Sequence, residues 1–161
     1  MIELQITKES IAEAKKLYDF GILNNSYTKG QGNKCGALGE VLVRQYYNGK
    51  QENTYDYDLV INNKKIDVKT KRFNARLTPT MKWTASLFDF NTKQNCDYYC
   101  FVGMADDYKK AYIYGFIAKD RFYKTAIFRK KGDVDPNGSS KWTFRADSYS
   151  TTLSELDLNL K

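Results

Sequence analysis

Residues 55–72 read YDYDLVINNKKIDVKTKR, two alternating segments that meet at a pair of asparagines. Because successive side chains of a strand point to opposite faces, this pattern predicts strands over residues 56–61 and 65–71 joined by a tight turn. One face carries the apolar side chains, Tyr55, Tyr57, Leu59, Ile61, Ile66 and Val68. The other carries the charged ones, Asp56, Asp58, Lys65, Asp67, Lys69 and Lys71. The hairpin therefore predicts a sheet with one face toward a core.

The length of the turn decides which charged side chains lie opposite one another. A two-residue turn at 62–63 places Asp58 across from Asp67, whereas a four-residue turn at 62–65 places Asp58 across from Lys69. Either turn keeps Asp58, Asp67 and Lys69 on one face. Directly opposed side chains have Cβ atoms roughly 5 Å apart, and like charges there destabilise a hairpin. A divalent cation between the two carboxylates explains the pattern; an ordinary solvated hairpin is the alternative.

The rest of the sequence alternates helical and strand patterns. Helical spacing predicts helices over residues 7–20 and 36–47, and residues 97–105 and 110–118 predict a second strand pair. Further expected elements are a short helix at 119–128, a last strand at 141–147, a short C-terminal helix at 151–161, and either helix or strand at 83–90. This order predicts one α/β domain over residues 1–161, with a central mixed β-sheet flanked by helices.

Composition limits the chemistry that the chain can perform. Its 161 residues include no histidine, which excludes Ser-His-Asp and Cys-His catalysis, zinc sites that need histidine, and nucleases with a histidine base. Any hydrolytic site must therefore use carboxylates, lysine and an oxygen-binding metal ion. The net charge of +7 favours a polyanionic partner.

The cysteines and the hydropathy pattern indicate where in the cell the protein is expected. Cys35, Cys96 and Cys100 are odd in number and lack CxxC spacing, so we expect free thiols in a cytoplasmic protein. No segment has the pattern of a secretory signal or of a transmembrane helix. We therefore expect no membrane association.

Glu40 is the acidic residue of the helix expected at 36–47. One mostly apolar stripe of this helix comprises Leu38, Val41, Leu42 and Gln45. Glu40 lies on the other side, which is also small or apolar, so burial of its carboxylate would be costly without a partner. A metal ion or the hairpin lysine would supply that partner. Exposure to solvent, or a pair with Arg44, is the alternative.

Glu40, Asp58 and the run Asp67-Val68-Lys69 resemble the PD-(D/E)xK nuclease superfamily. The resemblance rests on GALGE, YDYDLVI and KKIDVKT, and it covers roughly residues 36–70. It implies a restriction-endonuclease-like core. The sequence departs from the family pattern before the first acid, where a tyrosine replaces the usual proline, and Asp56 is a second candidate for that acid.

Carried over to this sequence, the resemblance implies a role for each residue. Asp58, Asp67 and the Val68 carbonyl would bind Mg²⁺ or Mn²⁺, and Glu40 would complete the ligand shell. Lys69 would position the attacking water. Carboxylate ligands suit such a hard cation. The expected catalytic residues are therefore Glu40, Asp58, Asp67 and Lys69.

Basic residues follow the hairpin closely. Between residues 64 and 82 they are Lys64, Lys65, Lys69, Lys71, Arg72, Arg76 and Lys82, with Asp67 as the only acid. Such a flank suits a nucleic-acid backbone, and we expect Lys71, Arg72, Arg76 and Lys82 to contact DNA. Trp83 and Phe88 could stack on bases but are typical of a core, and the basic residues 129–131 are typical of a solvated surface.

The sequence thus predicts a Mg²⁺-dependent deoxyribonuclease, an endonuclease of the compact kind that processes phage, nicked or branched DNA. Cutting both strands of a duplex needs two sites, so a homodimer is one expectation. Two alternatives remain open. The chain could be a non-catalytic nucleic-acid-binding module with a basic surface, or an interaction domain on the same fold whose carboxylates no longer act.

Overall fold

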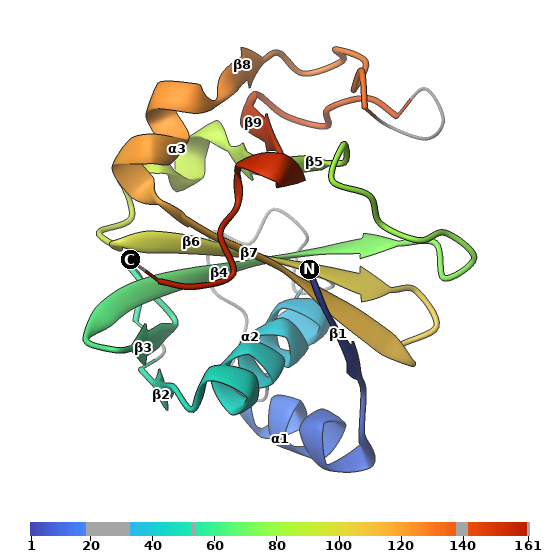
Figure 1. Cartoon of the computed structure of the whole chain (residues 1–161), viewed down its shortest axis with the longest axis vertical. Coiled ribbons are helices and arrows are strands. Elements are labelled where there is room, and N and C mark those ends of the chain that lie inside the picture. Colours follow the sequence, from blue (N-terminus) through green and yellow to red (C-terminus); the bar gives the residue numbers. More distant parts are fainter. Residues whose placement is uncertain (19–32, 53, 138–141, 161) are drawn as a thin grey trace.

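The computed structural model describes residues 1–18, 33–52, 54–137 and 142–160 (Figure 1). A six-stranded mixed sheet forms its centre, in the spatial order β1-β7-β6-β4-β3-β2. Its strands are β1 Ile2–Gln5, β2 Lys50–Gln51, β3 Leu59–Ile61, β4 Lys64–Phe73, β6 Tyr98–Ala105 and β7 Lys110–Ala118. Only β4 and β6 pair in parallel, and the other neighbours are antiparallel. The predicted α/β class with a central mixed sheet is confirmed.

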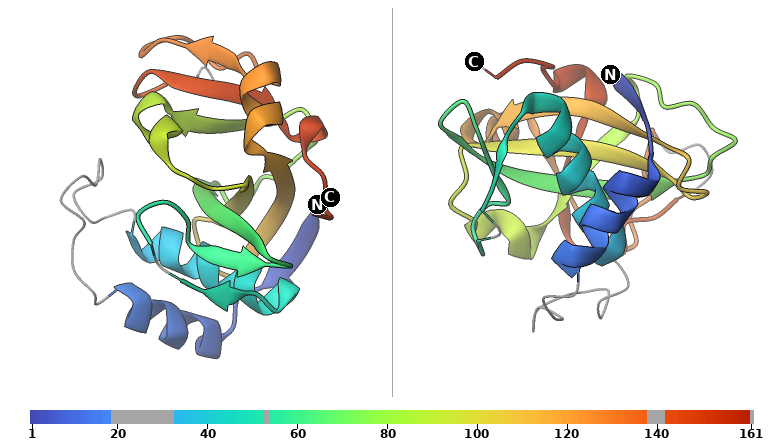
Figure 2. Two further views of the ribbon diagram at one scale, coloured as in Figure 1. Left: turned by 90° about the vertical axis from the view of Figure 1, so that its left-hand side faces the viewer. Right: turned by 90° about the horizontal axis from the view of Figure 1, so that it is seen from below.

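Different elements cover the two faces of the central sheet. Helices α1 (Lys8–Tyr18) and α2 (Asn33–Tyr47) lie on one face (Figures 1 and 2). The other face carries the helix α3 (Lys119–Thr125) and a second, three-stranded sheet. That sheet has the order β5-β9-β8 and consists of β5 Thr84–Phe88, β9 Ser148–Thr152 and β8 Ile127–Arg129. Single 3-10 turns follow β5, at η1 (Asp89–Lys93), and β9, at η2 (Leu153–Glu155).

The hairpin has the two-residue turn. Ile61 pairs with Lys64, and both turn residues, Asn62 and Asn63, have positive φ angles of 50° and 60°. Asparagine tolerates this left-handed conformation better than most residues, and a two-residue hairpin turn of this type requires it twice. The strand β3 begins at Leu59, so the expected strand at 56–61 is shorter than predicted. The strand β4, in contrast, continues to Phe73.

The two faces of β4 point into different environments. Ile66 and Val68 are buried in an apolar cluster with α2, as the alternation predicts. Asp67 faces the other side and is only 1% exposed. The tyrosines of the expected apolar face behave differently: Tyr55 is 71% exposed, because the strand has not yet begun at that residue.

The helix α2 approaches β4 closely through Gly39. A Cβ atom built at Gly39 would lie 2.0 Å from Thr70 Oγ1 and 3.1 Å from Thr70 Cβ. Only glycine fits this approach without a shift of its neighbour. The close packing brings the α2 side that holds Glu40 toward the hairpin.

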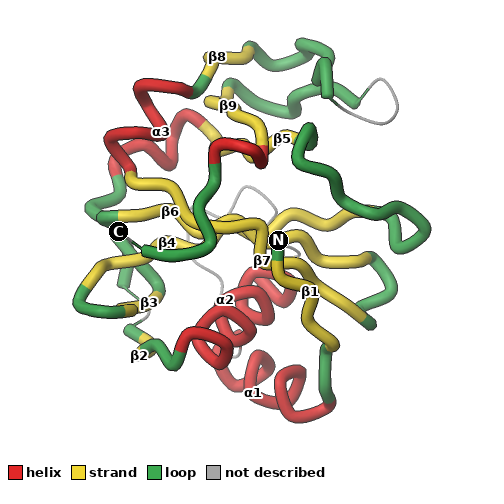
Figure 3. The backbone as a smooth tube through the Cα atoms, viewed as in Figure 1, coloured by secondary structure: helices red, strands yellow, loops and turns green. Residues whose placement is uncertain are grey.

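Several expected elements differ in the structure (Figure 3). The helix expected at 119–128 ends at Thr125, and residues 127–129 form β8. The last strand is β9 and not the segment expected at 141–147, whose described residues, 142–147, make only an isolated bridge at Thr143. The C-terminal helix is reduced to η2. Residues 19–20 of the first expected helix and 24–32 of the following loop lie outside the described residues. None of the helices in the described ranges is long and apolar enough to cross a membrane.

Candidate active site

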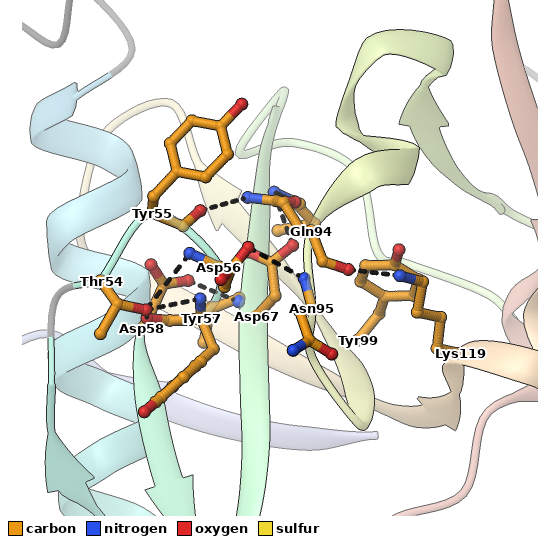
Figure 4. Close-up of polar contacts among 12 residues, drawn as sticks. Thr54, Tyr55, Asp56, Tyr57, Asp58, Asp67, Gln94, Asn95, Tyr99 and Lys119 are labelled. Atoms are coloured by element: carbon orange, nitrogen blue, oxygen red, sulfur yellow. Dashed lines mark hydrogen bonds and ion pairs between the residues drawn. The ribbon is translucent and has the colours of Figure 1, made fainter.

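Three carboxylates from three elements gather beside β4, where its pairing with β3 ends. Glu40 comes from α2, Asp58 directly precedes β3, and Asp67 lies in β4. Their charges act on one another: those of Glu40 and Asp67 raise the pKa of Asp58, and that of Asp67 raises the pKa of Glu40. Figure 4 shows Asp58 and Asp67 side by side in this cluster. The structure therefore brings together the three acids that the sequence predicts.

Asp58 is oriented by the strand that it faces. Its Oδ2 accepts a hydrogen bond of 2.7 Å from the backbone N–H of Val68. Burial, followed by the charges of Glu40 and Asp67, raises the pKa of Asp58 well above its ordinary value, and the Val68 N–H and the Lys69 ammonium partly oppose this shift. A carboxyl held this way binds either a proton or another cation more readily than an exposed aspartate does.

Asp67 and Lys69 form an ion pair on the inner face of β4, which is the face that points away from α2 and toward the second sheet. Lys69 Nζ lies 2.8 Å from Asp67 Oδ2, and the two side chains are 21% and 2% exposed. The direction of this approach does not suit a hydrogen bond, so Oδ2 is a buried carboxylate oxygen with no hydrogen-bond partner among the described residues. Burial raises the pKa of Asp67, and Lys69 opposes the rise.

Glu40 pairs with the hairpin side of the site and not with its own helix. Its Oε2 accepts a hydrogen bond of 3.1 Å from Gln51 Nε2. Burial raises its pKa, and the Gln51 hydrogen bond lowers it. Arg44, the alternative partner on α2, instead forms an ion pair with Glu13 of α1. Gln51 thus holds the Glu40 carboxylate, and the charges of Asp67 and Lys69 act on it.

The two candidates for the first acid have different surroundings. Asp56 Oδ1 accepts the backbone N–H of Asn95 at 3.1 Å, which ties its loop to the segment before β6. No influence of Asp56 on the cluster is found, whereas Asp58 interacts with both Glu40 and Asp67. Asp56 is therefore a loop anchor, and Asp58 is the carboxylate of the cluster.

The sequence interpretation missed two residues near Lys69, one that contacts it and one that contacts this partner. Gln94 Oε1 accepts a hydrogen bond of 3.1 Å from Lys69 Nζ. The backbone carbonyl of Gln94 accepts another from Lys119 Nζ, at the start of α3 (Figure 4). Neither residue belongs to a motif. Gln94 lies 25 residues from Lys69, and Lys119 lies 25 residues from Gln94. The parallel pairing of β4 with β6 brings Gln94 to the site, and the antiparallel pairing of β6 with β7 brings Lys119 there.

The four expected DNA-contacting residues do not form one group. Lys71 is exposed on the same face of β4 as Lys69, and its Nζ lies 4.0 Å from the ring centroid of Trp142. Arg72 points to the opposite face, where its charge acts on Cys35 of α2. Arg76 and Lys82 are exposed in the irregular segment after β4, about 20 Å or more along the strand from Asp67. Along β4, Lys71 is the closest of the four to Asp67, but its ammonium lies over Trp142 and the charge of Asp135 acts on it.

The two expected core aromatics are half-buried, as their residue type suggests. Trp83 packs edge-on against Phe73 with ring centroids 5.6 Å apart, and Phe88 stacks on Phe90. All three cysteines are free and buried. They therefore provide no second site beside the carboxylates.

The donor set suits a hard cation, although its present arrangement is not that of a finished metal site. In the described part of the chain, no three His, Cys, Asp or Glu side chains stand as a ready metal-binding group. Val68 holds one oxygen of Asp58, and the Lys69 ammonium occupies the cation position at Asp67. Clustered, partly buried carboxylates and the buried Asp67 oxygen without a hydrogen bond are nevertheless the features that a divalent cation would satisfy.

Comparison with known proteins finds no family model and no curated protein that matches this chain significantly. What the chain does must therefore be argued from the geometry and chemistry of the site.

Proposed function

We propose that this protein is a divalent-metal-dependent phosphodiesterase that cleaves DNA, with a restriction-endonuclease-like core. The observation that carries the proposal is the cluster of Glu40, Asp58 and Asp67 with the Lys69 ammonium 2.8 Å from Asp67. Burial raises the pKa of all three acids, and neighbouring acids raise it further in Asp58 and Glu40. Such an arrangement costs stability, and a functional site is where such a cost is commonly found. The absence of histidine from the sequence leaves carboxylates and lysine as the groups for hydrolysis.

The order of the elements supports the proposed core. Along the chain, the helix α2 is followed by the hairpin β3–β4 and later by the parallel strand β6. Glu40 lies on α2, Asp58 lies directly before β3, and Asp67 and Lys69 lie on β4. The connection from β4 to β6 runs through β5 and η1, which lie over the inner face. This places a covering layer above the face that carries Asp67 and Lys69.

Each residue of the cluster has a chemical task in this proposal. Glu40, Asp58, Asp67 and the Val68 carbonyl would hold Mg²⁺ or Mn²⁺, which supplies a water of lowered pKa and neutralises charge on the scissile phosphate. The N–H of Val68 and the amide of Gln51 keep two of the carboxylates in place. The Lys69 ammonium can only donate hydrogen bonds, so it orients the attacking water or stabilises negative charge on the phosphate.

The basic residues supply affinity for the polyanion. The chain carries a net charge of +7, and Lys71 extends the charged face of β4 outward from Lys69. Contacts of lysine and arginine with phosphates hold a nucleic acid without reading its sequence. Arg76 and Lys82 would contact a second stretch of a long substrate, because they lie away from the carboxylates.

The test is cleavage of supercoiled plasmid, linear duplex, single-stranded and branched DNA with Mg²⁺ or Mn²⁺. We expect at least one substrate to be cut, and cutting to stop with EDTA and in Lys69→Met. A matched control is Lys65→Met, which removes a lysine from the same strand that lies outside the cluster. A nicked plasmid as first product would indicate one site acting alone, and a linear product two coupled sites. No cleavage of any substrate by the wild type would refute the proposal.

A second candidate is a non-catalytic nucleic-acid-binding module. The observation that favours it is the Lys69–Asp67 ion pair, which already neutralises one carboxylate without a metal ion. This candidate predicts binding with a steep salt dependence and no effect of Mg²⁺. Calorimetric titration of Mg²⁺ or Mn²⁺ into the protein separates the two: heat of binding that is lost in Asp67→Asn favours the enzyme.

A further inference from the structure

The segment before β6 contacts the proposed site through one side chain, that of Gln94. Its Oε1 accepts a hydrogen bond from Lys69 Nζ at 3.1 Å, and its Nε2 donates one to the backbone carbonyl of Tyr55 at 3.3 Å. The orientation of the amide is dictated by its partners, because an ammonium only donates and a carbonyl only accepts. Gln94 therefore links Lys69 to the loop that leads to Asp58.

The same segment is fixed on three further sides. Lys119 Nζ donates to the Gln94 carbonyl, the Asn95 N–H donates to Asp56, and the Asp97 N–H donates to the carbonyl of Lys65 at 2.9 Å. These contacts join α3, the Asp58 loop and the start of β4. Gln94 is thus held at its side chain, at its own carbonyl and at the next residue (Figure 4).

Lys69 needs such a support because its side chain has many rotamers. Fixing a lysine costs more side-chain entropy than fixing most other residues. Its other partner, Asp67, is a proposed ligand of the cation, and a carboxylate that binds a cation has less negative charge left for an ammonium. Gln94 is the partner of Lys69 that does not take part in the cluster of acids.

We infer that Gln94 is a positioning residue, which holds the Lys69 ammonium over the reacting phosphate while Asp67 serves as a ligand. This inference rests on the proposed function, because it assigns a role within the same site. Lys119 supports the position of Gln94 from the side of its backbone. The expected effect is on turnover and not on substrate binding.

Two nearly isosteric variants separate this role from a structural one. Gln94→Glu keeps an acceptor oxygen for Lys69 and loses the donor to Tyr55, whereas Gln94→Met loses both. We expect Gln94→Met to lower kcat about 10- to 100-fold, the size of effect expected for a misplaced catalytic group, with KM within about twofold of the wild type. Gln94→Glu should stay within about fivefold in kcat. Asn95→Ala is the matched control, because it keeps the backbone N–H that Asp56 accepts.

Equal loss of activity in Gln94→Glu and Gln94→Met would overturn the inference, since it would place the importance in the Tyr55 contact. So would a rise in KM at constant kcat. Thermal unfolding of each variant shows whether a loss reflects folding, and Lys119→Met, expected to lower kcat about 3- to 10-fold, tests the support of Gln94 independently.

A readout without catalysis separates failure of the inference from failure of the proposed function. In metal-free protein, the ammonium of Lys69 should exchange its protons slowly enough to give a ¹⁵N-resolved NMR signal, assigned by its loss in Lys69→Met. We expect this signal to persist in Gln94→Glu and to broaden or vanish in Gln94→Met. A missing wild-type signal, or an unchanged one in Gln94→Met, would contradict the inference even if DNA is cleaved. If the Lys69 signal changes in Gln94→Met but the wild type cleaves no DNA, the contact between Gln94 and Lys69 is supported and the proposed function is refuted.

Discussion

The two faces of β4 show how one strand can serve stability on one side and chemistry on the other. Ile66, Val68 and Thr70 face α2, where Ile66 is fully buried and Val68 is 7% exposed. Asp67 and Lys69 face the opposite side, beneath the second sheet. Asp67 is as inaccessible as its apolar neighbours, yet its carboxylate has an oxygen without a hydrogen bond.

The difference lies in what burial does to each face. Apolar burial stabilises the fold by roughly 25 cal/mol for each Å² removed from water. Burial of carboxylates raises their pKa values and costs free energy unless each charge is paired. The inner face therefore weakens the fold that the outer face supports, and substitutions on the two faces should have opposite consequences.

The largest effect is expected on the inner face, in Asp67→Asn. Loss of the carboxylate should reduce DNA cleavage at least about a thousand-fold, which corresponds to about 4 kcal/mol of activation free energy. The measurement is single-turnover cleavage of the best substrate at saturating enzyme with Mg²⁺.

The same variant should bind DNA about as well as the wild type, because the basic residues are unchanged. Its control is Asp56→Asn, which alters a loop anchor outside the cluster and should lose much less than tenfold. Equal losses in both variants would mean that Asp67 matters for the fold of the site and not for its chemistry.

On the outer face of β4, which packs against α2, Ile66→Ala should lower stability and leave DNA cleavage nearly unchanged. Truncation of a fully buried isoleucine costs about 2–5 kcal/mol of unfolding free energy, because it leaves a cavity against α2. Chemical denaturation at 25 °C measures this loss. At a temperature where the variant is folded, its single-turnover cleavage should stay within about threefold. A larger loss of activity would show that the two faces of β4 are not independent.

The comparison also explains which parts of the structure the sequence could predict. Alternation and turn length are local, so the facing positions of Asp58 and Asp67 follow from a few neighbouring residues. Glu40 follows from helical spacing together with the glycines of its helix. Asp56 was separated from Asp58 only by the contact with Asn95, a residue far along the chain.

The strands that sequence interpretation missed either lack an alternating apolar pattern or are very short. The strand β9 reads SYSTT, and Ser148 and Ser150 are buried in it because neighbouring strands cover them, not because they are apolar. The strand β1 has only four residues at the start of the chain. Gln94 reaches the site through the β4–β6 pairing and Lys119 through the β6–β7 pairing, which no local pattern contains.

A moderate effect is expected where α2 meets the outer face, in Gly39→Ala. Alanine favours a helix by about 1 kcal/mol over glycine, but its Cβ would lie 2.0 Å from Thr70 Oγ1 and 3.1 Å from Thr70 Cβ. Overpacking of this kind costs about 1–3 kcal/mol, so the net result should be a loss of about 1 kcal/mol. The variant should also turn over more slowly, since Glu40 moves with the helix.

Thr70→Ala provides the double-mutant test. It removes the hydroxyl that would clash, and that hydroxyl has no hydrogen-bond partner in the described part of the protein. The unfolding free energies of the four proteins should give a favourable coupling of about 1 kcal/mol between the two substitutions. Additive values would show that the helix adjusts elsewhere and that the close approach is not required.

The smallest effect is expected in Asp58→Asn and concerns the free-energy cost of burying the Asp58 carboxylate. Its sign follows from the raised pKa of Asp58. The folded protein holds the proton of Asp58 to higher pH than the unfolded chain does. Its contribution to stability is therefore neutral below the unfolded pKa of about 4 and becomes increasingly unfavourable as the pH rises through the folded pKa. Asp58→Asn cannot ionise and avoids this cost.

We therefore expect Asp58→Asn to match the wild type in unfolding free energy near pH 3.5 and to exceed it at pH 7 in EDTA. Mg²⁺ should stabilise the wild type at pH 7 and not the variant, which reduces the difference. Denaturation curves of both proteins at the two pH values, with and without Mg²⁺, measure these differences in unfolding free energy. A variant less stable at pH 7 than at pH 3.5, relative to the wild type, would mean that the Val68 hydrogen bond outweighs the repulsion among the acids, and that the inner face of β4 stabilises the fold after all.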